Sequence, residues 1–440
     1  MADIFPFRAY RYNVQRVKPA DVLTQPYDKI TPAMQQRYAK ASPYNLITVE
    51  KGEPRPADSV SDNVYTRAEQ ALKQWIAEGI LVRDSTPGIY LYSQEYPVPG
   101  SAERRTRSGF IALGRAEDYS AGVVFRHEHT MTGPKADRLE LLRHTRTHTG
   151  QLFMLYTDPQ RRVDTLLASA ASGTPVESRD EYDVLHRLWP VFDSGVIAAV
   201  RQAMAGQKLV IADGHHRYET AVAYRDQCRA AAVRPDLDAP YEKVMMTFFN
   251  TRSEGLLILP THRVIAGLAD FNVDIFLAGV AAVFDQEIFP FAGIEDRAPV
   301  LDQFRRELAA QAAVPAIGMY AGHSFVLLSL KPSADLAALL PDVPPALRRL
   351  DVVLLHRLLL DKGLGITAGA VTAGQHLTYE RDIAAGLAPV DEGRAQACFL
   401  LNPIGVETTT EIALSGQVLP QKSTDFFPKL LSGIALYRMD

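Results

Sequence analysis

Hydrophobic side chains recur along the chain with two different periods, which predict helices and strands in turn. From Val64 to Ile76 they recur every three or four residues and stop before Gly79, so an amphipathic helix closed by a glycine is predicted there. Residues 89–96 and 106–116 are strand-like and flank a polar, turn-forming stretch. This pattern is typical of a β-hairpin.

Helices and strands are predicted to alternate along the rest of the chain. A helix is predicted after Thr31-Pro32, because threonine caps helices and proline suits the first helical turn. The middle of the chain predicts strands at 151–156 and 182–188, a helix at 163–170 and a helix capped by Asp193. The last part predicts helices at 294–311 and 347–362 and strands at 316–321 and 324–331.

This alternation predicts a multi-domain α/β protein, with an α+β arrangement as the open alternative. The predicted parts are an N-terminal α/β region at 1–120, a central domain at 121–265 and a C-terminal α/β domain at 266–440. At 440 residues the chain is long enough for such a division.

The stretch Lys208–Thr220 leads from an apolar strand through a polar turn into a helix predicted at 218–232. Asp213 and Gly214 form a strong turn pair, because aspartate bonds its own backbone and glycine accepts a positive φ. Two imidazoles and a guanidinium follow at once, from His215, His216 and Arg217. They add donors where the unpaired N–H groups and the dipole of a helix start already favour an anion. From the residues alone, two alternatives stay open: a phosphate site, and a simple helix cap by Asp213.

A second polar concentration lies at Phe125–Arg138, where a turn leads into a helix predicted at 135–148. Lys135 and Arg138 then lie near the helix N-terminus, with Asp137 beside them. Cations at that end oppose the helix dipole, and a bound anion would compensate for this inconsistency. Lys135 and Arg138 are therefore predicted phosphate ligands, and Asp137 is a secondary candidate.

His127, Glu128 and His129 place possible metal ligands in the same segment. The two histidines lack the i, i+4 helical spacing of His-Glu-x-x-His proteases, which excludes that class. In an extended segment the histidines share one face and Glu128 points to the other. A solvated loop with hydrogen-bonded histidines stays open as the alternative.

Two further polar groups are candidates for the same site. His262 and Arg263 follow a predicted strand at 256–259, and their alternative interpretation is a capped strand end. Lys422 and Ser423 lie in a loop between turn residues, where a phosphate contact is possible.

Composition and charge restrict the partners. The chain has 47 Lys and Arg against 51 Asp and Glu, a net charge of −4 that argues against nucleic acid. Its two cysteines, Cys228 and Cys398, indicate neither a disulfide framework nor a cysteine zinc site. No segment resembles a signal peptide or a membrane span, so a cytoplasmic protein is expected. The oligomeric state stays open.

Six motifs together resemble one known family over nearly the whole chain and in the same order. They are Gln25–Asp28, His127–Thr130, Gly133–Arg138, Asp213–Thr220, Pro260–Arg263 and Lys422–Thr424. The family is the uncharacterised bacterial and archaeal one called domain of unknown function 1015. Asp425 departs from it, because an aromatic residue is expected at that position.

The turn at Asp213–Arg217 also resembles the phosphate-handling motif of the ParB and sulfiredoxin superfamily, which includes free-serine kinases. The resemblance covers the middle of the chain and implies a ParB/sulfiredoxin-like central α/β domain. It implies phosphate contacts from Gly214, His215, His216 and Arg217. Sulfiredoxin chemistry is disfavoured, because the turn contains no cysteine.

These observations favour a small-molecule phosphotransferase that uses a nucleoside di- or triphosphate, ATP or ADP, together with Mg²⁺. Glu128 or Asp213 would hold Mg²⁺ or accept the proton of the acceptor hydroxyl. Proton transfer would fall to one of three histidines, His129, His215 or His216. The alternatives are a ParB-like nucleotide switch or DNA-associated module, and a metal-dependent hydrolase.

Overall fold

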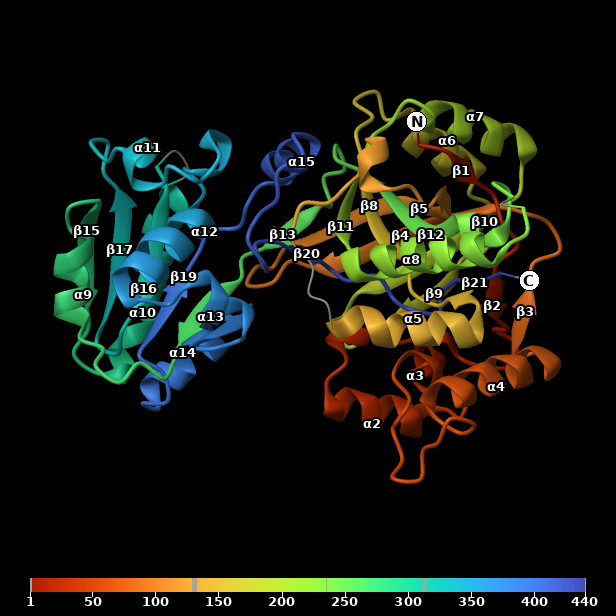
Figure 1. Cartoon of the computed structure of the whole chain (residues 1–440), viewed down its shortest axis with the longest axis horizontal. Helices are drawn as coiled ribbons and strands as arrows, with labels where there is room; N and C mark the ends of the chain where they lie inside the picture. The colour runs from red at the N-terminus through yellow and green to blue at the C-terminus, as the bar shows by residue number, and fades with distance from the viewer. Residues whose placement is uncertain (1, 129–132, 235, 312–313, 440) are drawn as a thin grey trace. The chain divides into compact units, whose positions relative to one another are not determined.

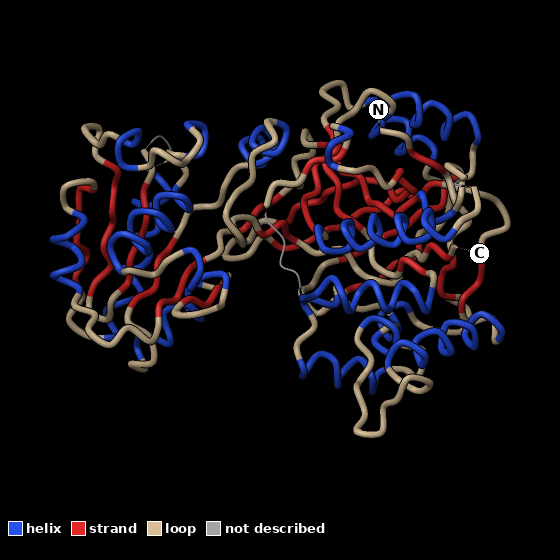
Figure 2. Tube along the Cα trace, viewed as in Figure 1, coloured by secondary structure: helices blue, strands red, loops and turns tan. Residues whose placement is uncertain are grey.

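The structure is a computed structural model that describes residues 2–128, 133–234, 236–311 and 314–439. It divides into two compact units. Unit 1 comprises Met1–Leu257, Ala413–Gly416 and Phe426–Asp440, and unit 2 comprises Ile258–Ile412 and Gln417–Asp425. Each unit combines helices with one large sheet (Figures 1 and 2), so the prediction of a multi-domain protein with mixed α and β structure is confirmed.

The large sheet of unit 1 is mixed. Its strands are β1 (Ile4–Phe5), β4 (Ile89–Pro97), β5 (Arg104–Arg115), β6 (Val124–Phe125), β8 (Leu152–Tyr156), β9 (Val176–Arg179), β10 (Leu185–Val191), β11 (Leu209–Asp213) and β12 (Lys243–Asn250). The order is β6-β11-β8-β12-β5-β4-β10-β9, with β1 paired to β5. Within the described pairs of this sheet, β6–β11 and β8–β12 are parallel and the others antiparallel.

Helices of unit 1 pack on this sheet and on one another. They are α1 (Pro19–Val22), α2 (Pro32–Ala41), α3 (Ile47–Glu50), α4 (Val64–Ala77), α5 (Gly133–Thr145), α6 (Arg162–Ala170), α7 (Ser194–Met204) and α8 (His215–Ala231), with the short 3₁₀ helix η1 at Tyr27–Lys29. Helix α8 packs on β8, α5 lies beside α8, and α4 lies beside α5 (Figure 1). This stacking brings the N-terminal helices next to the turn that follows β11.

Alternating side chains of the strands form the core of unit 1. Phe110, Met154 and Phe248 face the same core as Val200 of α7 and Tyr218 of α8, and all five are almost fully buried. Successive residues of a strand point to opposite faces. The neighbouring Ile111, Phe153 and Phe249 therefore face the other side, where they are also buried. Burial of both faces explains the continuous apolar runs of β8 and β12.

The division into units differs from the boundaries expected at 120 and 265. Strands β4 and β5 of the expected N-terminal region pair with β10 and β12 of the expected central domain. Cross-strand hydrogen bonds join these segments into one sheet, so residues on both sides of position 120 belong to unit 1.

Unit 2 contains an antiparallel sheet with helices on both faces. Its strands are β14 (His262–Ile265), β15 (Phe284–Pro290), β16 (Ala316–Tyr320), β17 (Ser324–Leu330), β18 (Leu377–Glu380) and β19 (Ala397–Leu400), in the order β15-β17-β16-β19-β14-β18. Its helices include α9 (Val273–Val280), α10 (Arg297–Ala310), α11 (Leu336–Leu339), α12 (Asp351–Leu354), the π-helix η6 (Leu355–Gly363), α13 (Ala368–Thr372) and α14 (Ile383–Asp391). Val326 and Leu328 face α9, α12 and η6, whereas Phe325 and Leu327 face α10 and α14.

The remaining elements are short. Besides four 3₁₀ helices of three residues each among the described residues, they are β2 (Tyr10–Tyr12), β3 (Leu81–Arg83), β7 (Thr147–His148), β13 (Leu257–Leu259), α15 (Val406–Leu414), β20 (Asp425–Phe427) and β21 (Tyr437–Arg438). Across the described ranges, no helix is both long and apolar enough to cross a membrane.

The helix expected at 294–311 is the 3₁₀ helix η4 (Ile294–Asp296) followed by α10. Four other expected element bounds differ from the structure for a local reason. The helix expected at 135–148 ends at Thr145, because Thr147 and His148 pair with β21. The helix expected at 218–232 begins three residues earlier, directly after Gly214. The strand expected at 182–188 begins at Leu185, after a turn at Asp183 with a positive φ of 59°. The helix expected at 347–362 begins at Asp351 and widens into η6.

Candidate functional site

The turn between β11 and α8 requires glycine at position 214. Gly214 has a φ of +95°, a conformation that residues with a Cβ rarely adopt. A Cβ atom there would lie 3.0 Å from Cδ2 of Leu152 and 3.1 Å from Nη2 of Arg217. The close approach lets Arg217, in the first turn of α8, fold back against its own turn.

Asp213 anchors two cations. Lys429 Nζ donates to its Oδ1 at 2.7 Å, and Arg217 Nη2 donates to its Oδ2 at 2.9 Å. Arg217 also donates through Nη1 to the carbonyl of Gln151. Burial by itself would raise the pKa of Asp213, but the charges of Lys429, Arg217 and Lys29 outweigh it and hold that pKa well below its usual value. The carboxylate therefore stays ionised.

Asp213 is not a helix cap, because its side chain accepts no backbone N–H of α8 and Gly214 occupies the N-cap position. Both of its oxygens accept from cations. The residue therefore fits neither a metal ligand nor a general base as it stands, and its observed role is to position Arg217.

His215 and His127 form a buried pair behind this turn. Their ring centroids are 4.8 Å apart, and His127 Nδ1 donates to the carbonyl of Ile211 at 2.7 Å. Burial lowers the pKa of both histidines, for His215 well below its usual value, so both are neutral near pH 7. Oε1 of Glu128 lies 3.7 Å from His215 Nδ1. Within the described structure, His215 Nε2 and Glu128 Oε2 are buried without a hydrogen-bond partner. His216 is half-buried.

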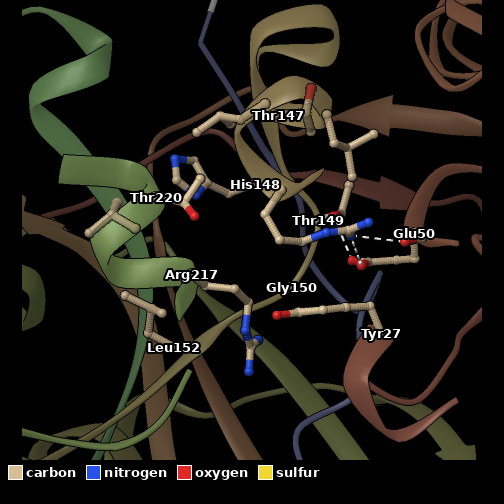
Figure 3. Close-up of a pocket in the computed structure, with 13 residues that line it drawn as sticks. Tyr27, Glu50, Thr147, His148, Thr149, Gly150, Leu152, Arg217 and Thr220 are labelled. Atoms are coloured by element: carbon tan, nitrogen blue, oxygen red, sulfur yellow. Dashed lines mark hydrogen bonds and ion pairs between the residues drawn. The ribbon is translucent and has the colours of Figure 1, made fainter. Parts of the chain in front are cut away.

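A small cavity of about 50 Å³ lies beside Arg217 (Figure 3). Its polar lining comes from Tyr27, Glu50, Arg138, Thr147, His148, Thr149, Arg217 and Thr220, and all of its lining residues belong to unit 1. Arg138 of α5 and Arg217 of α8, two of the predicted phosphate ligands, thus face one cavity. Figure 3 shows the Tyr27 hydroxyl directed toward the Arg217 side chain.

Glu50 holds one side of this cavity together. Thr149 Oγ1 donates to its Oε1 at 2.6 Å, and Arg138 Nη1 lies 3.4 Å from its Oε2 and donates to its carbonyl at 2.9 Å. The side chain of Glu50 is only 4% exposed. The guanidinium of Arg138 also lies over the Tyr27 ring, 4.4 Å from its centroid. Arg138 is therefore fixed in position by a buried carboxylate and an aromatic face.

Two other lining residues bear on what the cavity accepts. Thr220 is 4% exposed, and its Oγ1 is buried without a hydrogen-bond partner in the described structure. Burial lowers the pKa of His148 to about 4, so its imidazole is neutral near pH 7. A polar guest would therefore meet an unpaired hydroxyl and two fixed arginines.

Lys135 lies outside the lining of this cavity. It forms an ion pair with Glu219, while Asp137 accepts from Arg138 Nη2 at 2.6 Å and from the Tyr65 hydroxyl at 2.9 Å. The cations near the start of α5 are thus compensated by carboxylates of the protein itself.

The remaining predicted site residues belong to unit 2 or fall outside the described residues. His129 is outside the described residues. His262, Arg263, Lys422 and Ser423 belong to unit 2. There Arg263 donates to the carbonyls of Thr261 and Lys422, and Ser423 donates to the carbonyl of Pro420.

Sequence reasoning missed Glu50, Thr149 and Lys429. Glu50 and Thr149 lie in no motif, and Lys429 follows the loop of Lys422 and Ser423 without being assigned a role. Their partners lie far away in the chain: 99 residues separate Thr149 from Glu50, and 216 separate Lys429 from Asp213. Tyr27, which belongs to the Gln25–Asp28 motif, also lines the cavity. The described residues contain no group of three His, Cys, Asp or Glu side chains arranged to hold a metal ion.

A family model described as "Protein of unknown function (DUF1015)" matches residues 4–353. The chain belongs to this family. The resemblance drawn from the six motifs is thereby confirmed at the level of the family. A comparison with curated proteins found no match.

Solved structures show weak similarity to the chain. A conserved hypothetical protein from Pyrococcus furiosus is 12% identical, with a TM-score of 0.33, and the match covers 72% of this chain and 90% of that one. A free serine kinase in complex with AMP is 11% identical, with a TM-score of 0.35, and coverage is 72% and 86%. A variant of a free serine kinase in complex with ADP is 12% identical, with the same TM-score and coverage of 72% and 87%.

Proposed function

We propose that this protein is a phosphotransferase that uses ATP or ADP and acts on a small molecule. The observation that carries the proposal is the convergence of Arg138 and Arg217 on one cavity, beside a glycine turn that opens α8. Phosphoryl transfer relies mainly on fixed positive groups that position the transferred phosphate and offset its charge. The resemblance of the Asp213–Arg217 turn to phosphate-handling motifs supports the same assignment.

Each arginine is held by protein carboxylates, Arg217 by Asp213 and Arg138 by Glu50 and Asp137. Such pairing orients the guanidinium groups before a ligand arrives, so less entropy is lost on binding. A guanidinium has five N–H donors, and these pairs leave donors for a phosphate. At about 50 Å³ the cavity admits a small group only. The proposal therefore places a terminal phosphate at this cavity rather than a whole nucleotide.

Glu128 is the proposed base, since its Oε2 is buried without a hydrogen-bond partner in the described structure and His215 lies beside its Oε1. The alternative role of Glu128 is to hold the expected Mg²⁺, for which Asp213 is a poorer match because both of its oxygens accept from cations. A single carboxylate would not form a complete Mg²⁺ site by itself. Proteins commonly bind Mg²⁺ through one or two carboxylates together with the phosphates of the substrate. Bound Mg²⁺ would offset phosphate charge.

The test is transfer from ATP or ADP, labelled in the terminal phosphate, to a panel of amino acids and sugars, with the purified full chain. Arg217→Met and Arg138→Met should each lower the transfer rate at least about a hundredfold, because each removes a positive charge that would stabilise the transition state. Arg143→Met is the matched control. It lies on α5, is 42% exposed and pairs with Glu140 away from the cavity.

The proposal fails if no acceptor is labelled, or if Arg138→Met and Arg143→Met have equal rates. Saturable nucleotide binding without transfer, abolished by Arg217→Met, would instead support a nucleotide-binding switch.

A further inference from the structure

Unit 2 contains a larger cavity of about 430 Å³, which the proposed phosphotransferase site does not use. Helix α10 and the residues at and after the end of β19 form much of it. Most of its lining is apolar, including Phe304, Leu308, Ile383 and Leu400. Its volume falls within the range of about 300–1,000 Å³ that is usual for small-molecule sites.

His262 is a buried hydrogen-bond donor in the lining of this cavity. The backbone N–H of Leu401 donates to its Nδ1 at 3.3 Å, so Nδ1 carries no proton. Burial, together with the charge of Arg263, lowers the pKa of His262 to about 4. The ring is therefore neutral near pH 7, and its proton lies on Nε2. The Nε2–H group is buried and has no acceptor in the described part of the chain, and His262 as a whole is only 2% exposed.

Arg305 and Arg306 of α10 also line the cavity. Neither has an ion pair or hydrogen bond from its side chain within the described ranges. Arg297 on the same helix does pair with a carboxylate, that of Asp391. The cavity thus combines an apolar wall with two arginines that form no ion pair in the described part of the chain.

We propose that this cavity binds a small molecule that joins a carboxylate to an apolar body. The carboxylate lies against Arg305 and Arg306, and the body packs on the apolar wall. Guanidinium groups match the planar geometry of a carboxylate. Asp302 also lines the cavity and adds one negative charge, which favours a singly charged carboxylate over a doubly charged phosphate.

The first experiment titrates the full chain with phenylbutyrate by isothermal calorimetry, beside three matched probes. These are phenylbutanol, phenylbutylamine and phenylbutyl phosphate. Phenylbutyrate should bind saturably at one site, and the uncharged alcohol should bind at least about tenfold more weakly, because it lacks the charge-assisted hydrogen bonds. The amine should not bind. Equal binding of acid and alcohol, or tighter binding of the phosphate, would overturn the assignment.

The second experiment repeats the titration with variants of the cavity. Arg305→Gln combined with Arg306→Gln should weaken phenylbutyrate binding at least about tenfold and leave phenylbutanol unchanged. Arg349→Gln is the matched control, since Arg349 is an exposed arginine of unit 2 outside the cavity lining. Both arginines are exposed, so the double variant should fold, which a thermal melt verifies. Undiminished binding in the double variant, or an equal loss in the control, refutes the proposal.

Discussion

Replacing Lys429 by methionine tests whether the ion pairs around Asp213 hold the site together. Methionine keeps most of the apolar stem and removes the ammonium, which lies 2.7 Å from Asp213 Oδ1 on a side chain 9% exposed. A hydrogen bond to a charged group contributes about 1.5–3 kcal/mol. Because Arg217 still pairs with Asp213, we expect the lower part of that range, a loss of about 1.5–2 kcal/mol in the free energy of unfolding near pH 7.

The loss should depend on pH in a defined direction. The pKa of Asp213 lies well below its usual value: burial would raise it, and Lys429, Arg217 and Lys29 more than reverse that effect. A carboxylate with a depressed folded pKa stabilises the fold above its unfolded pKa of about 3.9, and the contribution is lost as the pH falls toward the folded value. The difference between wild type and Lys429→Met should therefore be full at pH 6–7 and shrink below about pH 4.

Urea denaturation followed by tryptophan fluorescence measures this difference, because both tryptophans, Trp75 and Trp189, lie in unit 1. Lys40→Met is the control, since Lys40 is an exposed residue in the last turn of α2. Its unfolding free energy should change by less than about 0.5 kcal/mol. No loss in Lys429→Met at pH 7, or a loss that stays constant down to pH 3, would show that the ion pair does not stabilise unit 1.

Further substitutions probe the same region. Gly214→Ala should destabilise unit 1 by about 1–3 kcal/mol, because the added Cβ meets a φ of +95° and a contact at 3.0 Å; an unchanged thermal midpoint would contradict this. Thr149→Val leaves a buried oxygen of Glu50 without its donor and should lower the free energy of unfolding in urea by about 1–3 kcal/mol. Equal stability would show that the hydrogen bond from Thr149 to Glu50 does not stabilise the fold. Because burial lowers the pKa of His148 to about 4, the unfolded chain binds a proton at this residue more readily than the folded protein does. The free energy of unfolding should therefore fall by up to about 1.4 kcal/mol per pH unit between about pH 6.5 and 4, and His148→Gln should flatten this slope in a pH series. Asn63→Ala removes the capping box of α4 and should lower the free energy of unfolding by about 1 kcal/mol, which a thermal melt would detect as a lower midpoint.

Local elements were largely predictable from the sequence. Thr31 caps α2 by accepting from the N–H of Met34, and Pro32 begins that helix, as the pair predicted. The hairpin of β4 and β5 and the cap of α7 by Asp193 also follow the expected pattern. Caps, turns and side-chain periods act between residues a few positions apart, so one stretch of sequence contains the whole interaction.

The Asp213–Arg217 turn shows where such reasoning ends. The sequence by itself determined a strand, a glycine turn and a helix start, and its motifs determined the family. Only the tertiary structure decided that Asp213 pairs with Lys429, and that Arg138 and Arg217 face one cavity with Glu50 between Arg138 and Thr149. These pairings join segments far apart in the chain. They depend on how α3, α5 and α8 pack and on which charges are buried together, and no local pattern of residues encodes that choice.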